Sequence, residues 1–226
     1  MNLKIKICGM RQPANIMEVA NLKPDLMGFI FYPGSPRYAG ETLKTENLIF
    51  LSEEIVRVGV FVNMDIEKIN KTILKYSLDM VQLHGDEDPE MCRQINENGV
   101  GVIKAFNIKE SSDFVLCEKY INHTRYFLFD ASTSKYGGSG KKLDWELLEK
   151  YNLKHPFFLS GGIAPGDEKE IKKIKNPAFY GIDVNSRFEI SPGIKDFEKL
   201  KIFIADIRSR PVVTQLPNLD YSITTT

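Results

Sequence analysis

Short runs of β-branched and aromatic residues recur along the chain, and stretches with helical spacing of apolar positions separate them. The first run is the alternating segment 3–7. On a regular strand Ile5 and Ile7 share one face of it, while Lys4, Lys6 and Cys8 share the other. Runs of this kind, bounded by turn residues, predict strands. We predict eight strands, at residues 4–7, 26–31, 57–62, 80–83, 100–105, 126–129, 157–159 and 180–184.

The segments between these strands have helical spacing and helix-start signals. Asp65 and Asp88 are N-cap residue types, whose side chains accept a hydrogen bond from the first turn of a helix. Pro13 and Pro89 stand at first-turn positions, where proline is favoured, and Gly99 follows a helical segment as a terminating glycine does. We predict eight helices, at residues 13–22, 41–52, 66–76, 89–98, 111–118, 144–151, 165–172 and 196–208.

Alternation of strands and helices predicts a parallel sheet. Eight such units in one chain suit a (β/α)8 barrel, which has about 250 residues. A doubly wound open sheet is the alternative, but the first loop lacks a G-x-G-x-x-G pattern and the repeats leave no room for a second domain. We therefore expect an α/β protein with a single-domain TIM barrel over residues 1–208. Residues 209–226 have no helical period and are expected to be a C-terminal tail, either disordered or a remnant of cloning.

Composition narrows the class of partner. The 226 residues include 30 basic and 30 acidic side chains, and the two signs are interspersed, which favours a small-molecule substrate over nucleic acid or an anionic membrane. No apolar stretch approaches the roughly 20 residues that span a bilayer, and the chain starts with a strand rather than a signal peptide, so we expect a cytoplasmic protein. The pattern leaves a monomer and a homodimer both open.

The cysteines do not form a recognisable framework. The chain has three, Cys8, Cys92 and Cys117, and none has C-x-x-C spacing. This disfavours both a set of disulfides and a structural zinc site.

Two residues at predicted strand ends are candidates for acid and base chemistry, because TIM barrels place their sites at the carboxyl ends of the strands. Cys8 ends the first strand and is a candidate base, although a free cysteine is more often a small buried hydrophobe. Asp130 ends an apolar run, where a partly desolvated carboxyl group can act as a general acid, although an aspartate here can also be a helix cap. The glycine-rich segment 134–140 is either a lid or a flexible linker.

The loops after the seventh and eighth strands are where TIM barrels commonly bind phosphate. Glycines let backbone N–H groups approach an anion closely, which favours a phosphate site over a plain tight turn and predicts a phosphorylated substrate. The candidate residues of these loops are Ser160, Gly161, Gly162, Asp183, Asn185 and Ser186.

Arg37 and His84 are further candidates for substrate binding. Arg37 follows a stiff Ser-Pro step and is suited to bidentate capture of a carboxylate, unless it is an ordinary surface arginine. No second histidine stands at metal-ligand spacing from His84, so we expect a binding or structural role for His84 and predict no metal site.

Several segments in chain order carry a resemblance to a known family. They are Lys-Ile-Cys-Gly-Met-Arg at 6–11, Gly-Phe-Ile-Phe-Tyr at 28–32 with Ser-Pro-Arg at 35–37, Val-Gly-Val-Phe-Val-Asn at 58–63, Val-Gln-Leu-His-Gly at 81–85, Gly-Gly-Ser-Gly at 137–140 with Asp-Trp at 144–145, and Leu-Ser-Gly-Gly-Ile at 159–163. Together they resemble phosphoribosylanthranilate isomerase. The order of the motifs over nearly the whole predicted barrel makes this resemblance specific.

The resemblance implies the third step of tryptophan synthesis from chorismate. That step is an Amadori rearrangement of N-(5′-phosphoribosyl)anthranilate to 1-(2-carboxyphenylamino)-1-deoxyribulose 5-phosphate. It implies Asp130 as the acid and Cys8 as the base, with no metal and no cofactor, since one acid and one base suffice. We expect Lys6, on the same strand face as Cys8, to favour the thiolate.

The resemblance also assigns the binding residues. Arg37 would meet the anthranilate carboxylate, and the residues that would surround the phosphate are Ser160, Gly161, Gly162, Asn185 and Ser186. One departure stands at the eighth strand, where family members often have Asp-Val-Ser-Ser-Gly-Val-Glu and this chain has Asp-Val-Asn-Ser-Arg-Phe-Glu at 183–189. Two other functions stay open at this point: another sugar-phosphate isomerase barrel, with dual substrates in histidine synthesis, and a catalytically silent binding module.

Overall fold

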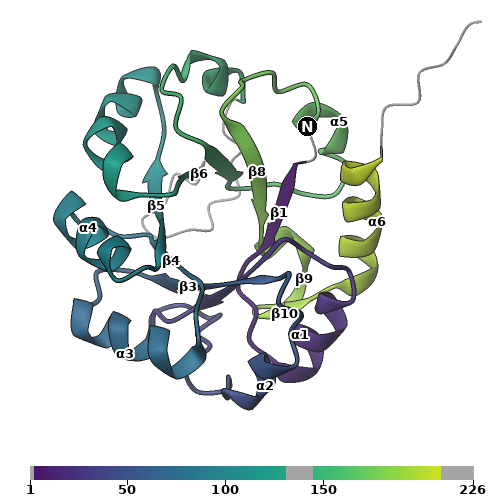
Figure 1. Ribbon diagram of the computed structural model, residues 1–226. Coiled ribbons are helices and arrows are strands. Elements are labelled where there is room, and N and C mark those ends of the chain that lie inside the picture. Colours follow the sequence, from purple (N-terminus) through teal and green to yellow (C-terminus); the bar gives the residue numbers. More distant parts are fainter. Residues whose placement is uncertain (1–2, 131–144, 210–226) are drawn as a thin grey trace, which may run out of the picture.

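Eight parallel strands close into a barrel, and the helices lie around it (Figure 1). The computed structural model describes residues 3–130 and 145–209. Each strand pairs with the next along the chain, and the first strand pairs with the last, so the predicted TIM barrel is confirmed. The strands are β1 (Lys4–Ile7), β2 (Leu26–Ile30), β3 (Val56–Phe61), β4 (Met80–Leu83), β5 (Gly101–Asn107), β6 (Tyr126–Asp130), β7 (Phe157–Ser160) and β8 (Phe179–Val184).

The helices that cover the barrel differ in length and type. In the described ranges the α-helices are α1 (Pro13–Ala20), α2 (Glu46–Ile49), α3 (Ile66–Tyr76), α4 (Pro89–Glu97), α5 (Glu168–Ile171) and α6 (Phe197–Arg208). The 3-10 helices there are η1 (Ser111–His123), η2 (Trp145–Lys150) and η3 (Ser186–Phe188). A two-stranded antiparallel sheet, β9 (Glu189–Ser191) with β10 (Ile194–Lys195), stands between β8 and α6.

The alternation of side chains along each strand separates two cores. Outward residues such as Ile5 and Ile7 pack under the helices. The inner cluster fills the barrel with one or two residues from most strands, among them Val58, Leu128 and Phe158. Because successive side chains point to opposite faces, the next inward positions toward the carboxyl ends include the buried polar residues Lys6 and Asp130. The chain thus changes from apolar to polar within the barrel, toward one end.

Every predicted strand is present, with each end within two residues of its predicted position. The predicted helix starts are also confirmed: Asp65 caps α3 and Asp88 caps α4, each accepting a backbone N–H at 2.8 Å. Gly99 follows α4 with a φ of 82°, as a terminating glycine does. The prediction of a helix over 41–52 is wrong, because only the single turn α2 forms there and the buried Leu43 and Leu51 pack from turns.

The ends of several other predicted helices are also wrong. The segment predicted at 111–118 is the longer 3-10 helix η1, the one predicted at 144–151 includes η2, and the one predicted at 165–172 contains only α5. The sheet β9–β10 was not predicted, because strands of three and two residues are too short to show alternation. Ser209 follows α6, and the rest of the predicted tail lies outside the described residues, as does the glycine-rich segment 134–140.

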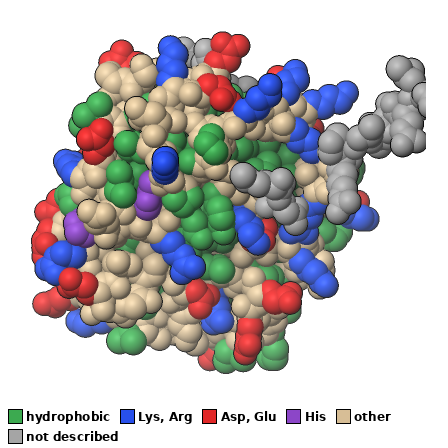
Figure 2. Space-filling model, turned by 45° about the horizontal axis from the view of Figure 1, so that its top comes forward, with side chains coloured by type: hydrophobic (Ala, Val, Ile, Leu, Met, Phe, Trp, Pro, Cys, Tyr) green, Lys and Arg blue, Asp and Glu red, His purple; other side chains and the backbone are tan. Residues whose placement is uncertain are grey.

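Figure 2 shows acidic and basic side chains interspersed over the face that it presents. No helix in the described ranges has both the length and the apolar character needed to cross a membrane.

Candidate active site

Cys8 lies at the carboxyl end of β1, where Gly9 turns the chain with a φ of 77°. Its backbone N–H donates to the Val184 carbonyl at 2.9 Å, which continues the pairing of β1 with β8. The side chain is buried, with 4% of the residue exposed. A Cβ on Gly28 of β2 would stand 2.8 Å from the Cys8 Sγ and 3.2 Å from the Lys6 Nζ. The missing side chain of Gly28 therefore makes the space that the thiol and the ammonium occupy.

Lys6 forms a buried ion pair with Asp183. The Lys6 Nζ donates to Oδ1 of Asp183 at 2.9 Å, across the pairing of β1 and β8. The Ser160 hydroxyl donates to Oδ2 of the same carboxylate at 3.4 Å. Asp183, one of the predicted substrate-binding residues, is thus engaged inside the barrel and holds two elements of the site together.

Burial raises the pKa of the Cys8 thiol. The positive charge of Lys6 opposes this shift, as the sequence predicts, but the Asp183 carboxylate works with burial and the shift remains upward. Burial alone would lower the pKa of Lys6, yet the attraction of Asp183 and of Cys8 outweighs it and the pKa is raised. Burial thus favours the neutral thiol of Cys8, while the neighbouring Lys6 ammonium favours its thiolate.

The carboxyl group of Asp130 stands at the end of β6 and faces His84. Asp130 is 7% exposed. The His84 Nε2 lies 3.3 Å from its Oδ2, and the His84 Nδ1 lies 2.9 Å from the amide nitrogen of Gln82 on β4. If the Gln82 amide donates to Nδ1, the neutral imidazole carries its proton on Nε2, from which it can donate to Asp130. His84 is therefore placed to orient the carboxyl group.

A second buried ion pair fixes the loop that carries His84. The Lys104 Nζ donates to Oε2 of Glu87 at 3.1 Å and to the Gly85 carbonyl at 2.7 Å. Glu87 in turn accepts the backbone N–H groups of Asn63 at 2.8 Å and of Gly85 at 2.9 Å. The loops after β3 and β4 are thereby tied to β5, so the position of His84 does not depend on its own contacts alone.

The predicted phosphate residues occupy the ends of β7 and β8. Gly161 and Gly162 follow Ser160 with φ values of 89° and 74°, a left-handed conformation that glycine adopts without strain. Ser186 begins η3 and is exposed. Asn185 is predicted to contact the phosphate, but its side-chain oxygen accepts a hydrogen bond from the Lys195 Nζ at 2.6 Å. The turn after β7 thus has the glycines that let backbone N–H groups approach an anion, while the Asn185 side-chain oxygen is already bonded within the protein.

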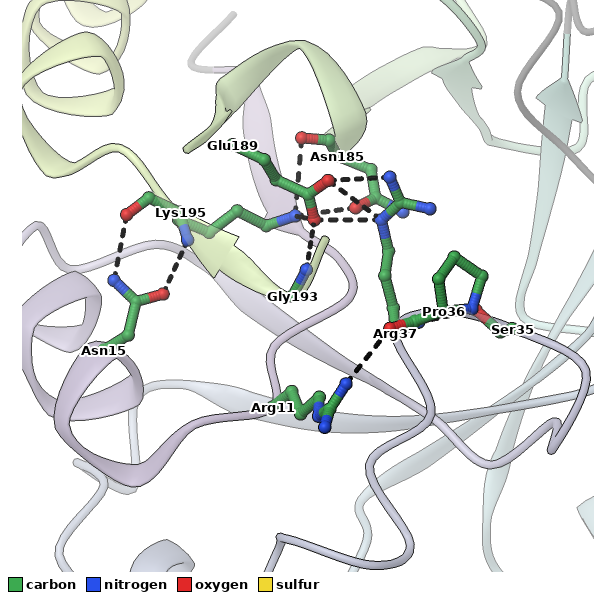
Figure 3. A network of polar contacts seen from close by, with 9 residues as sticks. All are labelled: Arg11, Asn15, Ser35, Pro36, Arg37, Asn185, Glu189, Gly193 and Lys195. Atoms are coloured by element: carbon green, nitrogen blue, oxygen red, sulfur yellow. Dashed lines mark hydrogen bonds and ion pairs between the residues drawn. The ribbon is translucent and has the colours of Figure 1, made fainter. Parts of the chain in front are cut away.

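Arg37 already binds a carboxylate, that of Glu189 on β9 (Figure 3). Glu189 also accepts a hydrogen bond from Lys195 of β10 at 2.8 Å. The sequence did not predict either residue, because Glu189 is 152 positions from Arg37 and the contact of Lys195 with Glu189 depends on the sheet β9–β10. The Pro-Gly step at 192–193, typical of a tight turn, was the signal that could have revealed their hairpin.

Cys92 and Cys117 are not part of this site. They lie in the outer core, on α4 and η1, where burial raises the pKa of each thiol to about 12. Of the three cysteines, Cys8 alone stands at a strand end beside a cation. Within the described part of the chain, no group of three or more His, Cys, Asp or Glu residues could hold a metal ion.

The carboxyl ends of the strands thus bring together four kinds of chemistry: the thiol of Cys8, the carboxyl group of Asp130, the glycine turn after Ser160 and the guanidinium of Arg37. A thiol and a carboxyl group are able to transfer protons, and a glycine turn and a guanidinium are able to bind a phosphate and a carboxylate.

Comparisons with known proteins agree with this chemistry. Residues 5–206 match the family model described as N-(5′phosphoribosyl)anthranilate (PRA) isomerase. The N-(5′-phosphoribosyl)anthranilate isomerase of Parabacteroides distasonis is 47% identical over 212 residues, which span 93% of this chain and 96% of that protein.

Solved structures are similar over the same length. The crystal structure of phosphoribosyl anthranilate isomerase from Thermus thermophilus matches with a TM-score of 0.79 at 28% identity, covering 91% of this chain and 98% of that one. A phosphoribosyl anthranilate isomerase in complex with reduced 1-(o-carboxyphenylamino)-1-deoxyribulose 5-phosphate matches with a TM-score of 0.74 at 30% identity, covering 91% and 98%.

Proposed function

Because the chain belongs to the N-(5′-phosphoribosyl)anthranilate isomerase family, it is an isomerase of tryptophan biosynthesis, and we propose that Cys8 is its general base and Asp130 its general acid. The observation that carries this assignment is the position of the Cys8 thiol. Cys8 directly follows the last residue of β1, and its buried side chain lies beside the Lys6 ammonium. Asp130 is the last residue of β6, at the same end of the barrel.

The proposed reaction needs an acid that donates one proton to the substrate and a base that removes another proton from it. Asp130 protonates the furanose ring oxygen, the bond from that oxygen to C1′ breaks, and the anthranilate nitrogen supplies the electron pair that forms an iminium. The Cys8 thiolate then removes the proton from C2′, and the electrons of that bond neutralise the iminium to give an enolamine. Tautomerisation of the enolamine yields the ketone product, 1-(2-carboxyphenylamino)-1-deoxyribulose 5-phosphate.

Lys6 and Asp183 prepare Cys8 for its role. Because burial favours the neutral thiol, the ammonium of Lys6 is the group that favours the thiolate, which is the form that acts as the base. Asp183 keeps that ammonium charged and in place inside the barrel. Neither residue needs to touch the substrate to act in this way.

The remaining contacts orient the substrate. We assign the phosphate to the turn of Ser160, Gly161 and Gly162 together with Asn185 and Ser186, and the anthranilate carboxylate to Arg37. His84 orients Asp130 and lines the site beside it. We also place the reaction in the cytoplasm, because the three cysteines are unpaired and thiols stay reduced there.

The test generates phosphoribosylanthranilate in situ and follows its disappearance with purified protein. Cys8→Ala and Asp130→Asn are each expected to remove most of the turnover, because each removes a group that transfers a proton. Binding of the product analogue, reduced 1-(o-carboxyphenylamino)-1-deoxyribulose 5-phosphate, is expected to be retained, because neither group is proposed to hold the substrate. Cys92→Ala is the matched control, since it removes a buried thiol outside the site. Equal losses of rate and of analogue binding would make Cys8 and Asp130 substrate anchors instead.

A further inference from the structure

One edge of the Arg37 guanidinium is held by a carboxylate of the protein. The Arg37 Nε lies 2.9 Å and 3.0 Å from the two carboxylate oxygens of Glu189, and the Arg37 Nη2 lies 2.7 Å from Oε2 (Figure 3). The Glu189 side chain is 4% exposed. Within the described residues, Nη1 has no hydrogen-bond partner, so the other edge of the fork remains available.

A second cation meets the same carboxylate. The Lys195 Nζ donates to Oε1 of Glu189 at 2.8 Å, and the Gly193 N–H donates to that oxygen at 3.0 Å. Lysine is rarely buried without a partner, and Lys195 is 1% exposed. We refer to Arg37, Glu189 and Lys195 as the Arg37 cluster. With Lys195 protonated, its two positive charges and one negative charge leave one positive charge in excess.

The Arg37 cluster lies directly against the turn that follows the catalytic thiol. A Cβ on Gly9 would stand 2.8 Å from Cδ of Arg37 and 2.6 Å from Oδ1 of Asn185. Burial lowers the pKa of Lys195, and the nearby charge of Arg37 lowers it further, while Glu189 and Cys8 act in the opposite direction. A buried cluster with an excess positive charge is costly unless an anion completes it.

Two asparagines fix Lys195 in this position. Asn15 of α1 donates to the Lys195 carbonyl at 2.9 Å and accepts the Lys195 N–H at 2.7 Å (Figure 3). The Asn185 side chain accepts from the Lys195 Nζ at 2.6 Å. Family members often have serine at the position of Asn185. The longer side chain of asparagine places its oxygen within hydrogen-bond distance of the Lys195 Nζ. Both ends of Lys195 are therefore held.

We propose that Glu189 and Lys195 are positioning residues for Arg37: they hold one edge of its guanidinium so that the other edge meets the substrate carboxylate, and Lys195 supplies the charge that this anion balances. The proposal rests on the proposed function, in which Arg37 recognises the anthranilate carboxylate. It adds to that function two residues that do not touch the substrate themselves.

The experiment measures binding of two ligands by calorimetry. One is reduced 1-(o-carboxyphenylamino)-1-deoxyribulose 5-phosphate, and the other is the phenylamino analogue that lacks the carboxyl group. Lys195→Met and Glu189→Gln are each expected to weaken binding of the first ligand roughly tenfold to a hundredfold, because hydrogen bonds to charged groups have that effect. Binding of the second ligand is expected to change less than about twofold.

The two variants separate position from charge. Glu189→Gln raises the net charge of the Arg37 cluster but removes one of the two oxygens that hold Arg37, while Lys195→Met keeps the Arg37 pair but removes the excess charge. Stronger binding of the carboxylated ligand by Glu189→Gln would overturn the positioning role. Equal losses for both ligands would reduce the cluster to a structural element and also overturn the proposal.

Two controls distinguish the proposal from the function on which it rests. Lys4→Met removes a lysine that pairs with Asp25 at the other end of β1, and it is expected to bind both ligands as the unaltered protein does. If the unaltered protein binds both ligands equally well, Arg37 does not recognise the carboxylate, and that part of the proposed function fails together with the cluster. If it discriminates and Arg37→Ala does not, the role of Arg37 stands whatever the two cluster variants do.

Discussion

At the scale of single residues, the absence of a side chain at Gly28 sets the geometry of the thiol. A methyl group there would stand 2.8 Å from the Cys8 Sγ, closer than two such atoms approach, so the thiol or the strand would have to move. We expect Gly28→Ala to lower kcat by about a hundredfold, because a shift of about 1 Å in a catalytic group has that effect. Steady-state kinetics measure this, with the midpoint of urea unfolding recorded in parallel.

Gly101→Ala is the matched control for this substitution. A Cβ on Gly101, at the start of β5, would stand 2.9 Å from the Cε of Met80, which is the flexible end of a side chain and can turn away. We expect this variant to retain its kcat. A Gly28→Ala protein with unchanged kcat would show that the thiol has more freedom than its contacts indicate.

The pH dependence of turnover reports the state of Cys8. Burial raises the pKa of the thiol above its ordinary value, and in the proposed mechanism the thiolate is the form that takes the proton from C2′. Turnover also needs the protonated form of Asp130, so kcat/KM is expected to be flat between the pKa values of the two groups and to fall above the higher one. We expect this fall to begin above about pH 8.5, where an ordinary thiol is half ionised, because the pKa of the Cys8 thiol is raised. Initial rates across a pH series measure this, and a fall that begins near neutral pH would mean that the pKa of the thiol is not raised.

At the scale of the elements, the short sheet β9–β10 supplies two charged residues of the site that the barrel strands do not carry. It carries Glu189 and Lys195 to Arg37, and Asn15 of α1 ties it to the barrel with two hydrogen bonds. We expect Asn15→Ala to lower the free energy of unfolding by about 2 to 4 kcal/mol, because two buried backbone groups lose their partners. Urea unfolding measures this change.

Asn98→Ala provides the comparison for that experiment, because Asn98 is exposed at the end of α4. Its expected effect is within about 0.5 kcal/mol. Asn15→Ala with an equally small effect would mean that water replaces both lost hydrogen bonds and that the sheet holds its place without α1.

The elements that the sequence predicts best are those with a strong local pattern. Strands such as β1 and β4 end where predicted, because alternation and flanking turn residues are local signals. The segment 41–52 has leucines at near-helical spacing, yet turns bury Leu43 and Leu51 equally well, so the spacing alone did not specify a helix. The periodicity of apolar residues predicts which residues are buried more reliably than it predicts the secondary structure that buries them.

The site could be predicted only in part for a related reason. The rule that TIM barrels place their chemistry at strand ends was enough to select Cys8, Asp130 and Arg37 as candidates. It did not reveal that Glu189, 152 positions from Arg37, occupies one edge of the guanidinium, because that contact depends on how the barrel closes. Nor did it show that burial outweighs Lys6 in setting the pKa of the thiol, since burial is a property of the folded chain.

At the scale of the whole molecule, the buried carboxylates link stability to pH. Burial alone would raise the pKa of Glu189, but the hydrogen bonds from Arg37 and the charge of Lys195 lower it below its ordinary value. A lowered pKa in the folded state stabilises the protein above the unfolded value, about 4.3, and this contribution is lost as the pH falls through the folded pKa.

We therefore expect the stability of the unaltered protein to decline more steeply between about pH 5 and pH 3 than that of Glu189→Gln. Urea unfolding at several pH values in this range measures both slopes. Parallel slopes for the two proteins would mean that the Glu189 carboxylate has the same pKa in the folded and unfolded chains.

The ion pair of Lys6 with Asp183 has a consequence for synthesis of the chain. Its two residues are 177 positions apart, and they join the first strand to the last. A nascent chain that has not yet emerged as far as β8 holds Lys6 without its counter-ion and Cys8 without the strand that flanks it. The proposed catalytic centre is thus completed only after β8 has been synthesised, and we expect shortened chains that lack β8 to have no isomerase activity.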